Sequence, residues 1–210
     1  MAEVVESSNN NIVMPKLITF LSSLLQRVSD SNDLLLLHQH QKISVFHGLT
    51  RPTISIHSYL ERIFKYANCS TSCFIVAYVY LDRFTQKHPL FPINSFNVHR
   101  LLITSVMVAA KFMDDLYYNN AYYAKVGGIS TLEMNFLEVD FLFGLGFCLN
   151  VTPCTFQAYC ANLQREMLVM EPPLNFADSS LISLGKSLKS HLCFNNEDNE
   201  SSHQHQQLAV

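Results

Sequence analysis

Two charged side chains stand in strongly apolar stretches of the sequence, and their surroundings restrict what they can do. Lys111 ends the apolar run of "MVAAKFMDD" at 107–115, and Asp82 interrupts "YVYLDRF" at 78–84. A charge withdrawn from water needs a polar partner, so both residues should be paired or hydrogen-bonded. For Lys111 two interpretations stay open. It complements the C-terminus of its own helix, which contributes about 0.3 to 1 kcal/mol, or it meets polar groups of a binding partner.

Groups that could support catalysis or hold a metal form no recognisable pattern. The stretch "GLGFCL" at 144–149 matches the start of a dinucleotide-binding fingerprint, but it lacks the third glycine and lies in an expected helix rather than after a strand. Cys69 and Cys73 could share a helix face, yet neither they nor the scattered histidines have zinc-site spacing. A Cys-His nucleophile pair would be visible only in coordinates. The sequence therefore predicts no catalytic residue, no cofactor and no metal, and reduced, mostly buried cysteines.

The composition and charge are those of a globular intracellular chain. Of its 210 residues 49% are apolar, which suffices for a sizeable core in one domain with tails. The formal net charge is −3 and no basic stripe is present, so nucleic acid is not an expected partner. The first residues lack the pattern of a signal peptide, and no run reaches the roughly 18 apolar residues of a membrane span. We expect no membrane association and a nuclear or cytoplasmic location, without a preference between them.

Helical periodicity dominates the chain from residue 51 to about residue 167, and strand patterns are scarce. Six helices are expected there: 56–67, 73–84, 96–113, about 117–124, one opened by the capping box of Ser130 and Glu133, and one opened by Thr152 and Pro153. The third is apolar all round and is expected at the centre of the domain. In the fifth helix two faces are distinct, one made of Leu132, Phe136, Val139 and Phe143 and the other of Thr131, Asn135 and Glu138.

The two ends of the chain differ from this dense region. A polar leader precedes an amphipathic helix at 16–28, which "SDSND" at 29–33 is expected to break. The apolar stripe of that helix covers either its own domain or a partner. A Gln/His-rich link follows, and "NNEDNESSHQHQQLAV" at 195–210 is too polar to bury and is expected to be disordered.

Three ordered segments resemble signature segments of cyclins. They are "YVYLDRF" at 78–84, "MVAAKFMDD" at 107–115 and "FLEVDFLFGLGFCLNVTPCTF" at 136–156. The stretch "FKYANCSTSCFIVAYVYLDRF" at 64–84 is similar to the plant P-type or U-type cyclins, relatives of the fungal phosphate-signalling cyclins. The resemblance implies an all-α fold, a single five-helix cyclin box at 51–165 with flanking helices, an N-terminal region at 1–50 and a largely disordered extension at 166–210.

The resemblance also implies a function without catalysis by the chain itself. It implies a regulatory subunit that binds and activates a cyclin-dependent protein kinase, in the cell cycle or in nutrient (phosphate) signalling. The kinase-contacting lysine and glutamate of the family fall on Lys111 and Glu138. The family's structural aspartate falls on Asp82, with Arg51 or Arg62 as its expected partner. The alternative is a cyclin-fold adaptor that activates no kinase.

The sequence departs from many cell-cycle cyclins in two places. The first helix of the expected box reads "TISIHSYLERI" at 53–63 and lacks the "MRAIL" text through which many cyclins recruit substrates. The leader contains no RxxL destruction box, because Arg27 is followed by "VSD". A DNA-gripping relative of the fold would carry two boxes and a basic face, and this chain shows room for one box and no such face.

Overall fold

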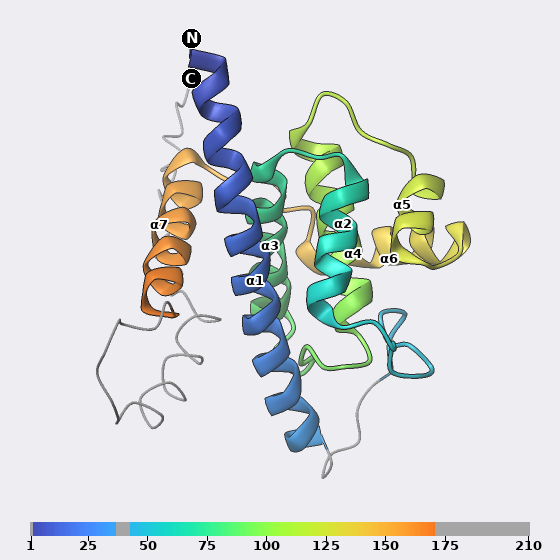
Figure 1. The fold of residues 1–210 in the computed structure, drawn as a ribbon. Helices are drawn as coiled ribbons and strands as arrows, with labels where there is room; N and C mark the ends of the chain where they lie inside the picture. Colours follow the sequence, from blue (N-terminus) through green and yellow to red (C-terminus); the bar gives the residue numbers. More distant parts are fainter. Residues whose placement is uncertain (1, 37–42, 171–210) are drawn as a thin grey trace, which may run out of the picture. The chain divides into compact units, whose positions relative to one another are not determined.

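Every regular element in the described part of the chain is a helix (Figure 1). The computed structural model describes residues 2–36 and 43–170, with the side chains of 14–35 and 43–168. Its seven helices are α1 (Ala2–Leu36), α2 (Ile56–Ala67), α3 (Thr71–Lys87), α4 (Val98–Met113), α5 (Asn120–Gly127), α6 (Thr131–Leu145) and α7 (Pro153–Met170). The predicted all-α fold is confirmed, and α2–α6 lie within residues 51–165, where the five-helix box was expected.

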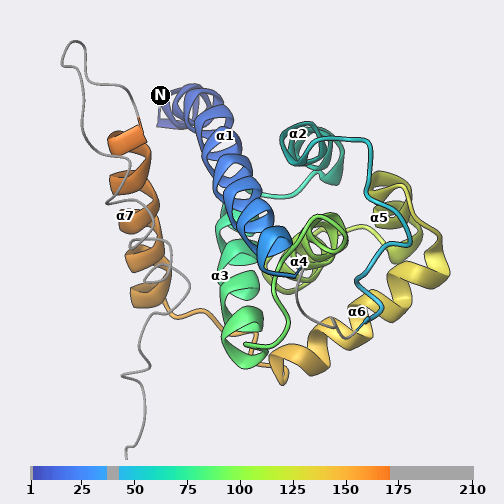
Figure 2. The same ribbon diagram turned by 90° about the horizontal axis from the view of Figure 1, so that it is seen from below.

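Helix α4 is the central element, as its apolar sequence predicts. Apart from His99 and Arg100, all residues from Val98 to Ala110 are buried. Helices α2, α3, α5 and α6 all contact it, and the view from below shows them arranged around it (Figure 2). The last turn of α4 leaves this core, so Lys111 stands where the buried part of the helix ends.

Helix α6 is fixed at both ends by local signals in the sequence. The predicted capping box is present, because Ser130 Oγ accepts a hydrogen bond from Glu133 N at 3.1 Å and Glu133 Oε2 accepts one from Ser130 N at 3.0 Å. Gly146 ends the helix with a φ of 59°, in the left-handed region that favours glycine. A Cβ on Gly144 would lie only 2.3 Å from Phe84 Cε2, so α6 packs on α3 through a position without a side chain.

Helix α1 is longer than the sequence predicts. It runs through Pro15 and through "SDSND", which we expected to break it. Its predicted apolar stripe is buried against the chain's own domain, where α1 contacts α2 and α7: Leu17, Phe20, Leu21, Leu24, Leu25 and Val28. This packing favours a core-closing role over partner binding for the stripe.

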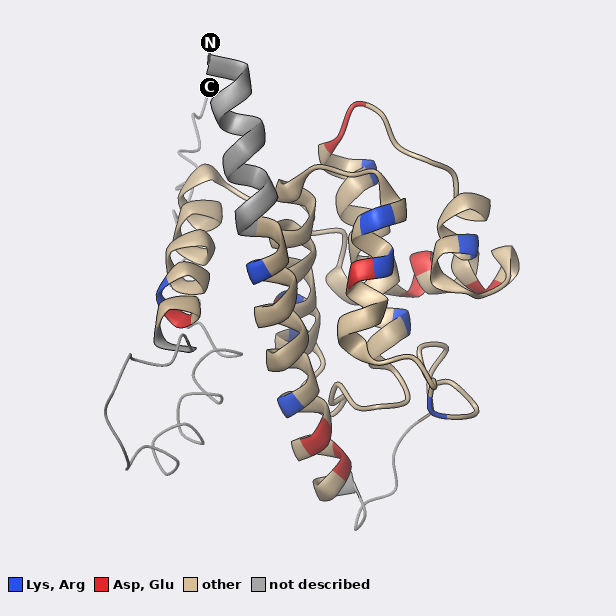
Figure 3. Cartoon of the chain, in the orientation of Figure 1, with Lys and Arg blue, Asp and Glu red and all other residues tan. Residues whose placement is uncertain are grey.

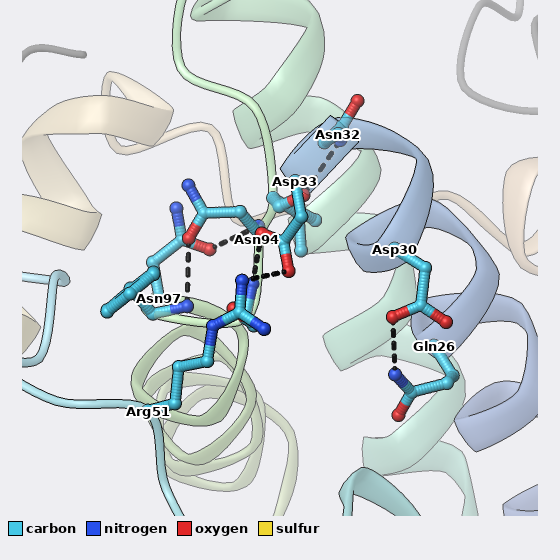
Figure 4. A network of polar contacts seen from close by, with 10 residues as sticks. Gln26, Asp30, Asn32, Asp33, Arg51, Asn94 and Asn97 are labelled. Carbon is cyan, nitrogen blue, oxygen red and sulfur yellow. Dashed lines mark hydrogen bonds and ion pairs between the residues drawn. The ribbon is translucent and has the colours of Figure 1, made fainter. Parts of the chain in front are cut away.

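Tertiary contacts explain why the polar residues near the end of α1 do not terminate the helix (Figure 4). Asn32 Nδ2 donates to Ile93 O at 2.7 Å, and Asp33 accepts from Ser95 N at 3.2 Å. The Arg51 guanidinium lies 3.0 Å from the Asp33 carboxylate. These polar groups are satisfied by distant parts of the chain, so they do not compete with the helix for its backbone.

Other helix limits differ from the predicted ones by a few residues. Helix α2 matches the prediction at both ends, with Asn68 in the left-handed conformation as its C-cap. Helix α4 begins at Val98 rather than next to Ser95, because Asn97 Oδ1 accepts from Asn94 N at 2.8 Å and holds a turn there. Helix α5 lies three residues later than expected, since Asn119 is its N-cap. The Gln/His-rich residues 37–42 and the tail from 171 onward lie outside the described residues.

Candidate partner-binding site

The side chains of Lys111 and Glu138 meet where α4, α5 and α6 converge. Lys111 lies in the last turn of α4, and Glu138 lies in the middle of α6. Lys111 Nζ is 2.6 Å from Glu138 Oε1, and the two side chains are 25% and 19% exposed. The structure therefore brings together two residues that are 27 positions apart in the sequence, at a place where both remain reachable from solvent.

Two asparagines complete this charged pair. Lys111 Nζ also donates to Asn120 Oδ1 at 2.5 Å. Asn120 Nδ2 donates to Glu138 Oε2 at 2.6 Å and to Asn135 Oδ1 at 2.8 Å. The sequence placed Asn135 on the same helix face as Glu138, and the structure agrees. Asn120 was not predicted, because nothing in "YYNNAYY" at 117–123 distinguishes a network residue from a helix cap.

An exposed apolar face of α6 lies beside this network. Its members are the four residues that the sequence assigned to one face: Leu132 (64% exposed), Phe136 (56%), Val139 (49%) and Phe143 (69%). We call these four residues the α6 stripe. The α6 stripe is turned by about 100° around the helix axis from the face that carries Glu138, because each residue of the stripe directly follows a residue on or next to that face. Opposite them, Met134, Leu137, Phe141 and Leu145 are buried in the core.

More apolar side chains are exposed where α4 ends. Phe112 and Met113 follow Lys111 directly, and Leu116 and Tyr117 follow in the connection to α5, with Leu116 88% exposed. Contiguous exposed apolar surface beyond a few hundred Å² is uncommon on monomeric proteins and marks interaction sites. Exposed apolar side chains on α6 and at the end of α4 therefore lie on both sides of the Lys111–Glu138 pair, as is typical of a protein–protein interface.

The structure gives the buried Asp82 partners that the sequence did not predict. Its Oδ2 accepts a hydrogen bond from Gln86 Nε2 at 3.0 Å and another from the hydroxyl of Tyr159 on α7. Burial, and then the hydrogen bond to Asp82, raise the pKa of Tyr159, so its hydroxyl remains a donor at neutral pH. Asp82 therefore links α3 to α7.

The two arginines predicted for Asp82 make other contacts. The Arg51 guanidinium pairs with Asp33 near the end of α1, as described above. Arg62 Nη2 donates to Lys125 O at 2.9 Å and thereby joins α2 to α5. Both residues have structural roles, but their contacts differ from the predicted brace.

The sequence features that resemble catalytic or metal-binding motifs have structural roles where the structure describes them. Gly144 and Gly146 serve the packing and the end of α6. The prediction of mostly buried cysteines is wrong for the described residues, since Cys148 and Cys154 are exposed and Cys73 alone among them is fully buried. Cys73 Sγ donates to Asp114 Oδ2 at 3.2 Å, an oxygen that also accepts from Ser70 N at 3.0 Å. Asp114 thus connects the end of α4 to the start of α3. Within residues 14–35 and 43–168 no group of three or more His, Cys, Asp or Glu side chains could hold a metal ion.

Lys and Arg residues are distributed over several of the described helices and do not follow a single one (Figure 3). None of the described helices is both long enough and apolar enough to span a membrane.

The helical arrangement and the ordered motifs agree with the comparison to known families. A family model described as Cyclin matches residues 7–149, so the chain belongs to the cyclin family. Among its relatives, Cyclin-U4-1 of Arabidopsis thaliana is 69% identical over 206 residues, which cover 96% of this chain and 98% of that protein. Cyclin-P4-1 of Oryza sativa subsp. japonica is 58% identical over 165 residues, which cover 76% of this chain and 78% of that protein. The predicted similarity to plant P-type and U-type cyclins is confirmed.

Proposed function

We propose that the chain is a regulatory subunit that binds and activates a cyclin-dependent protein kinase and catalyses no reaction itself. The observation that carries this proposal is the Lys111–Glu138 pair, preformed at 2.6 Å beside the exposed α6 stripe. A soluble domain gains nothing from exposing Phe136 and Phe143 on a helix whose other face is already in the core. A partner that covers the stripe would remove this apolar surface from water.

Activation would follow from a preference for one state of the kinase. A protein kinase is active when its β3 lysine pairs with the glutamate of its mobile C-helix and the DFG aspartate holds the metal. A partner shifts this equilibrium only by its differential affinity for the two states. A rigid surface built on α4, α5 and α6 can provide that difference, because it fits one placement of the C-helix and leaves unpaired polar groups against the other.

The charged pair and the stripe would contribute differently to the complex. Apolar and aromatic residues at the centre of an interface carry most of the affinity, while charged groups set orientation and suppress wrong partners. Lys111 and Glu138 neutralise each other in the free chain, so binding does not bury two isolated charges. Two of the three ammonium hydrogens of Lys111 are used within the chain, and the third can bind an acceptor on the kinase.

A role in cell division or in phosphate signalling is a finer proposal that rests on the similarity to plant P-type and U-type cyclins. Phosphate starvation of plants that lack the chain would test the second role, with the induction of phosphate-responsive transcripts as the readout. An altered response with normal cell division would favour phosphate signalling, and the opposite result would favour the cell cycle.

Affinity purification of the chain followed by a histone kinase assay tests the main proposal. We expect a cyclin-dependent kinase to co-purify with phosphorylating activity that the free kinase lacks. A kinase that binds but stays inactive would indicate the adaptor alternative. Failure of every cyclin-dependent kinase to bind the folded chain would refute the proposal. Phe143→Asp is the matched negative control. Because Phe143 is 69% exposed, we expect this variant to keep its fold but to bind the kinase more weakly.

A further inference from the structure

We propose that Asn120 is a positioning residue of the kinase-binding site, because its side-chain amide fixes the geometry in which Lys111 and Glu138 are presented to the partner. This inference rests on the proposed function and adds a residue that the similarity to cyclins does not supply. Asn120 is the first residue of α5, so it connects a third helix to the Lys111–Glu138 pair, whose members lie on α4 and α6.

The contacts determine how the Asn120 amide is oriented. Its oxygen accepts from Lys111 Nζ, and its nitrogen donates to Glu138 Oε2 and to Asn135 Oδ1. A flipped amide would turn its two N–H groups toward the ammonium group, which has no acceptor, and its oxygen toward the carboxylate, which has no donor. The oxygen and both amide hydrogens are therefore used in one orientation only.

The amide restricts two side chains that would otherwise be mobile. Lysine has a four-carbon stem with about 2 kcal/mol of rotamer entropy, and an ion pair without a further anchor must bear the cost of ordering it. Glu138 is likewise held through both oxygens, one by Lys111 and the other by Asn120. Asn120 thus converts a single contact between two helices into a closed three-residue ring of hydrogen bonds.

Capping of α5 does not account for Asn120. The preceding residue, Asn119, is the N-cap, and its Oδ1 accepts from Tyr122 N at 3.0 Å. The two adjacent asparagines therefore have separate roles, since Asn119 begins the helix and Asn120 serves the charged pair. Asn119→Ser keeps a capping side chain and is the matched control for substitutions at Asn120.

The first experiment needs no kinase and tests the positioning itself. Asn120→Asp keeps an oxygen for Lys111 but removes both donors and places a second carboxylate beside Glu138. We expect it to lower the melting temperature of the full chain. The exchange variant Asn120→Asp/Glu138→Gln returns one amide and one carboxylate to the ring and should recover most of that loss. If the exchange variant melts no higher than Asn120→Asp, the positioning role is overturned.

The second experiment measures affinity for the co-purifying kinase. We expect Asn120→Ala to weaken binding about ten-fold, and less than about two-fold when Lys111→Met and Glu138→Gln are already present, because the residue then has nothing to position. Asn119→Ser should bind like the unmodified chain. Equal losses in both backgrounds would overturn the inference and leave the proposed function intact. Unchanged affinity in every variant, including Lys111→Met, would instead show that the kinase binds elsewhere on the chain, and it would overturn both the inference and the proposed site while kinase binding itself stands.

Discussion

Removal of Lys111 or Glu138 should separate the fold of the chain from its binding function. In the free chain each side chain is about three-quarters or more buried and hydrogen-bonded to the other and to Asn120. Exposed ion pairs contribute about 0.2 to 1 kcal/mol, whereas loss of one member of a fully buried pair costs about 3 to 5 kcal/mol. For a partly buried pair we expect Lys111→Ala and Glu138→Ala each to cost about 1 to 2 kcal/mol of stability, with the helical fold retained.

The loss of affinity should be larger than the loss of stability. Truncation of one partner in a desolvated polar contact costs about 2 to 5 kcal/mol of binding free energy, which corresponds to a dissociation constant about 30-fold to several thousand-fold higher. Thermal melting and kinase affinity are measured on the same preparations, well below the melting temperature for the binding assay. Unchanged affinity in both variants would refute the proposed interface.

Glu133→Ala is the control for this experiment. Glu133 lies on the same helix as Glu138, but it closes the capping box with Ser130 and pairs with Arg100 at 2.8 Å. Its removal should cost about 1 kcal/mol of stability, as loss of a cap does. We expect its kinase affinity to be unchanged, so a general effect of losing a carboxylate from α6 would appear in this variant as well.

Three further outcomes test other parts of the structure. Phe143→Asp in the α6 stripe should weaken kinase binding by at least about ten-fold, as loss of an apolar contact does, while circular dichroism melting stays within a few degrees of the unmodified chain. Gly144→Ala should destabilise the chain by about 1 to 3 kcal/mol in chemical denaturation, because the new Cβ meets Phe84 at 2.3 Å; equal stability would show that α6 can shift. Hydrogen bonds from Ser130 lower the pKa of Glu133 below its unfolded value, so its contribution is present above about pH 4.3 and is lost as pH falls through the lower folded pKa. The stability difference from Glu133→Gln should therefore shrink on acidification, and a difference that grows would contradict this assignment.

Signals that act within a few residues were readable from the sequence. The capping box of Ser130 and Glu133, the end of α2 at Asn68 and the apolar length of α4 depend on neighbouring residues or on periodicity, and the structure has all three. The pairing of Lys111 with Glu138 was not readable in this way. The resemblance to cyclins named both residues as kinase contacts, but their contact with each other depends on how α4 and α6 cross.

Predictions failed or stayed incomplete where a distant contact decides the outcome. "SDSND" has the composition of a helix break, yet Asn32 and Asp33 bond to residues more than 60 positions away, and the helix continues. Arg51 and Arg62 were the expected partners of Asp82, but the structure places them on Asp33 and on the Lys125 carbonyl. Among the donors to Asp82 are Gln86 and Tyr159, which the sequence did not predict. Composition identifies a group that must be satisfied, but only the tertiary arrangement identifies the group that satisfies it.

Helix α6 carries more apolar residues than its own domain buries, and this difference bears on function. A helix that carries apolar residues on more than one face is normally enclosed by its own domain, as α4 is. In α6 only one apolar face is enclosed, and Phe136 and Phe143 remain 56% and 69% exposed on another. Stability of the free chain does not require apolar residues there, since a charged residue at an exposed helix position usually changes stability by less than about 0.5 kcal/mol. The excess of apolar residues over what the fold buries is therefore the feature of α6 that supports the proposed interface.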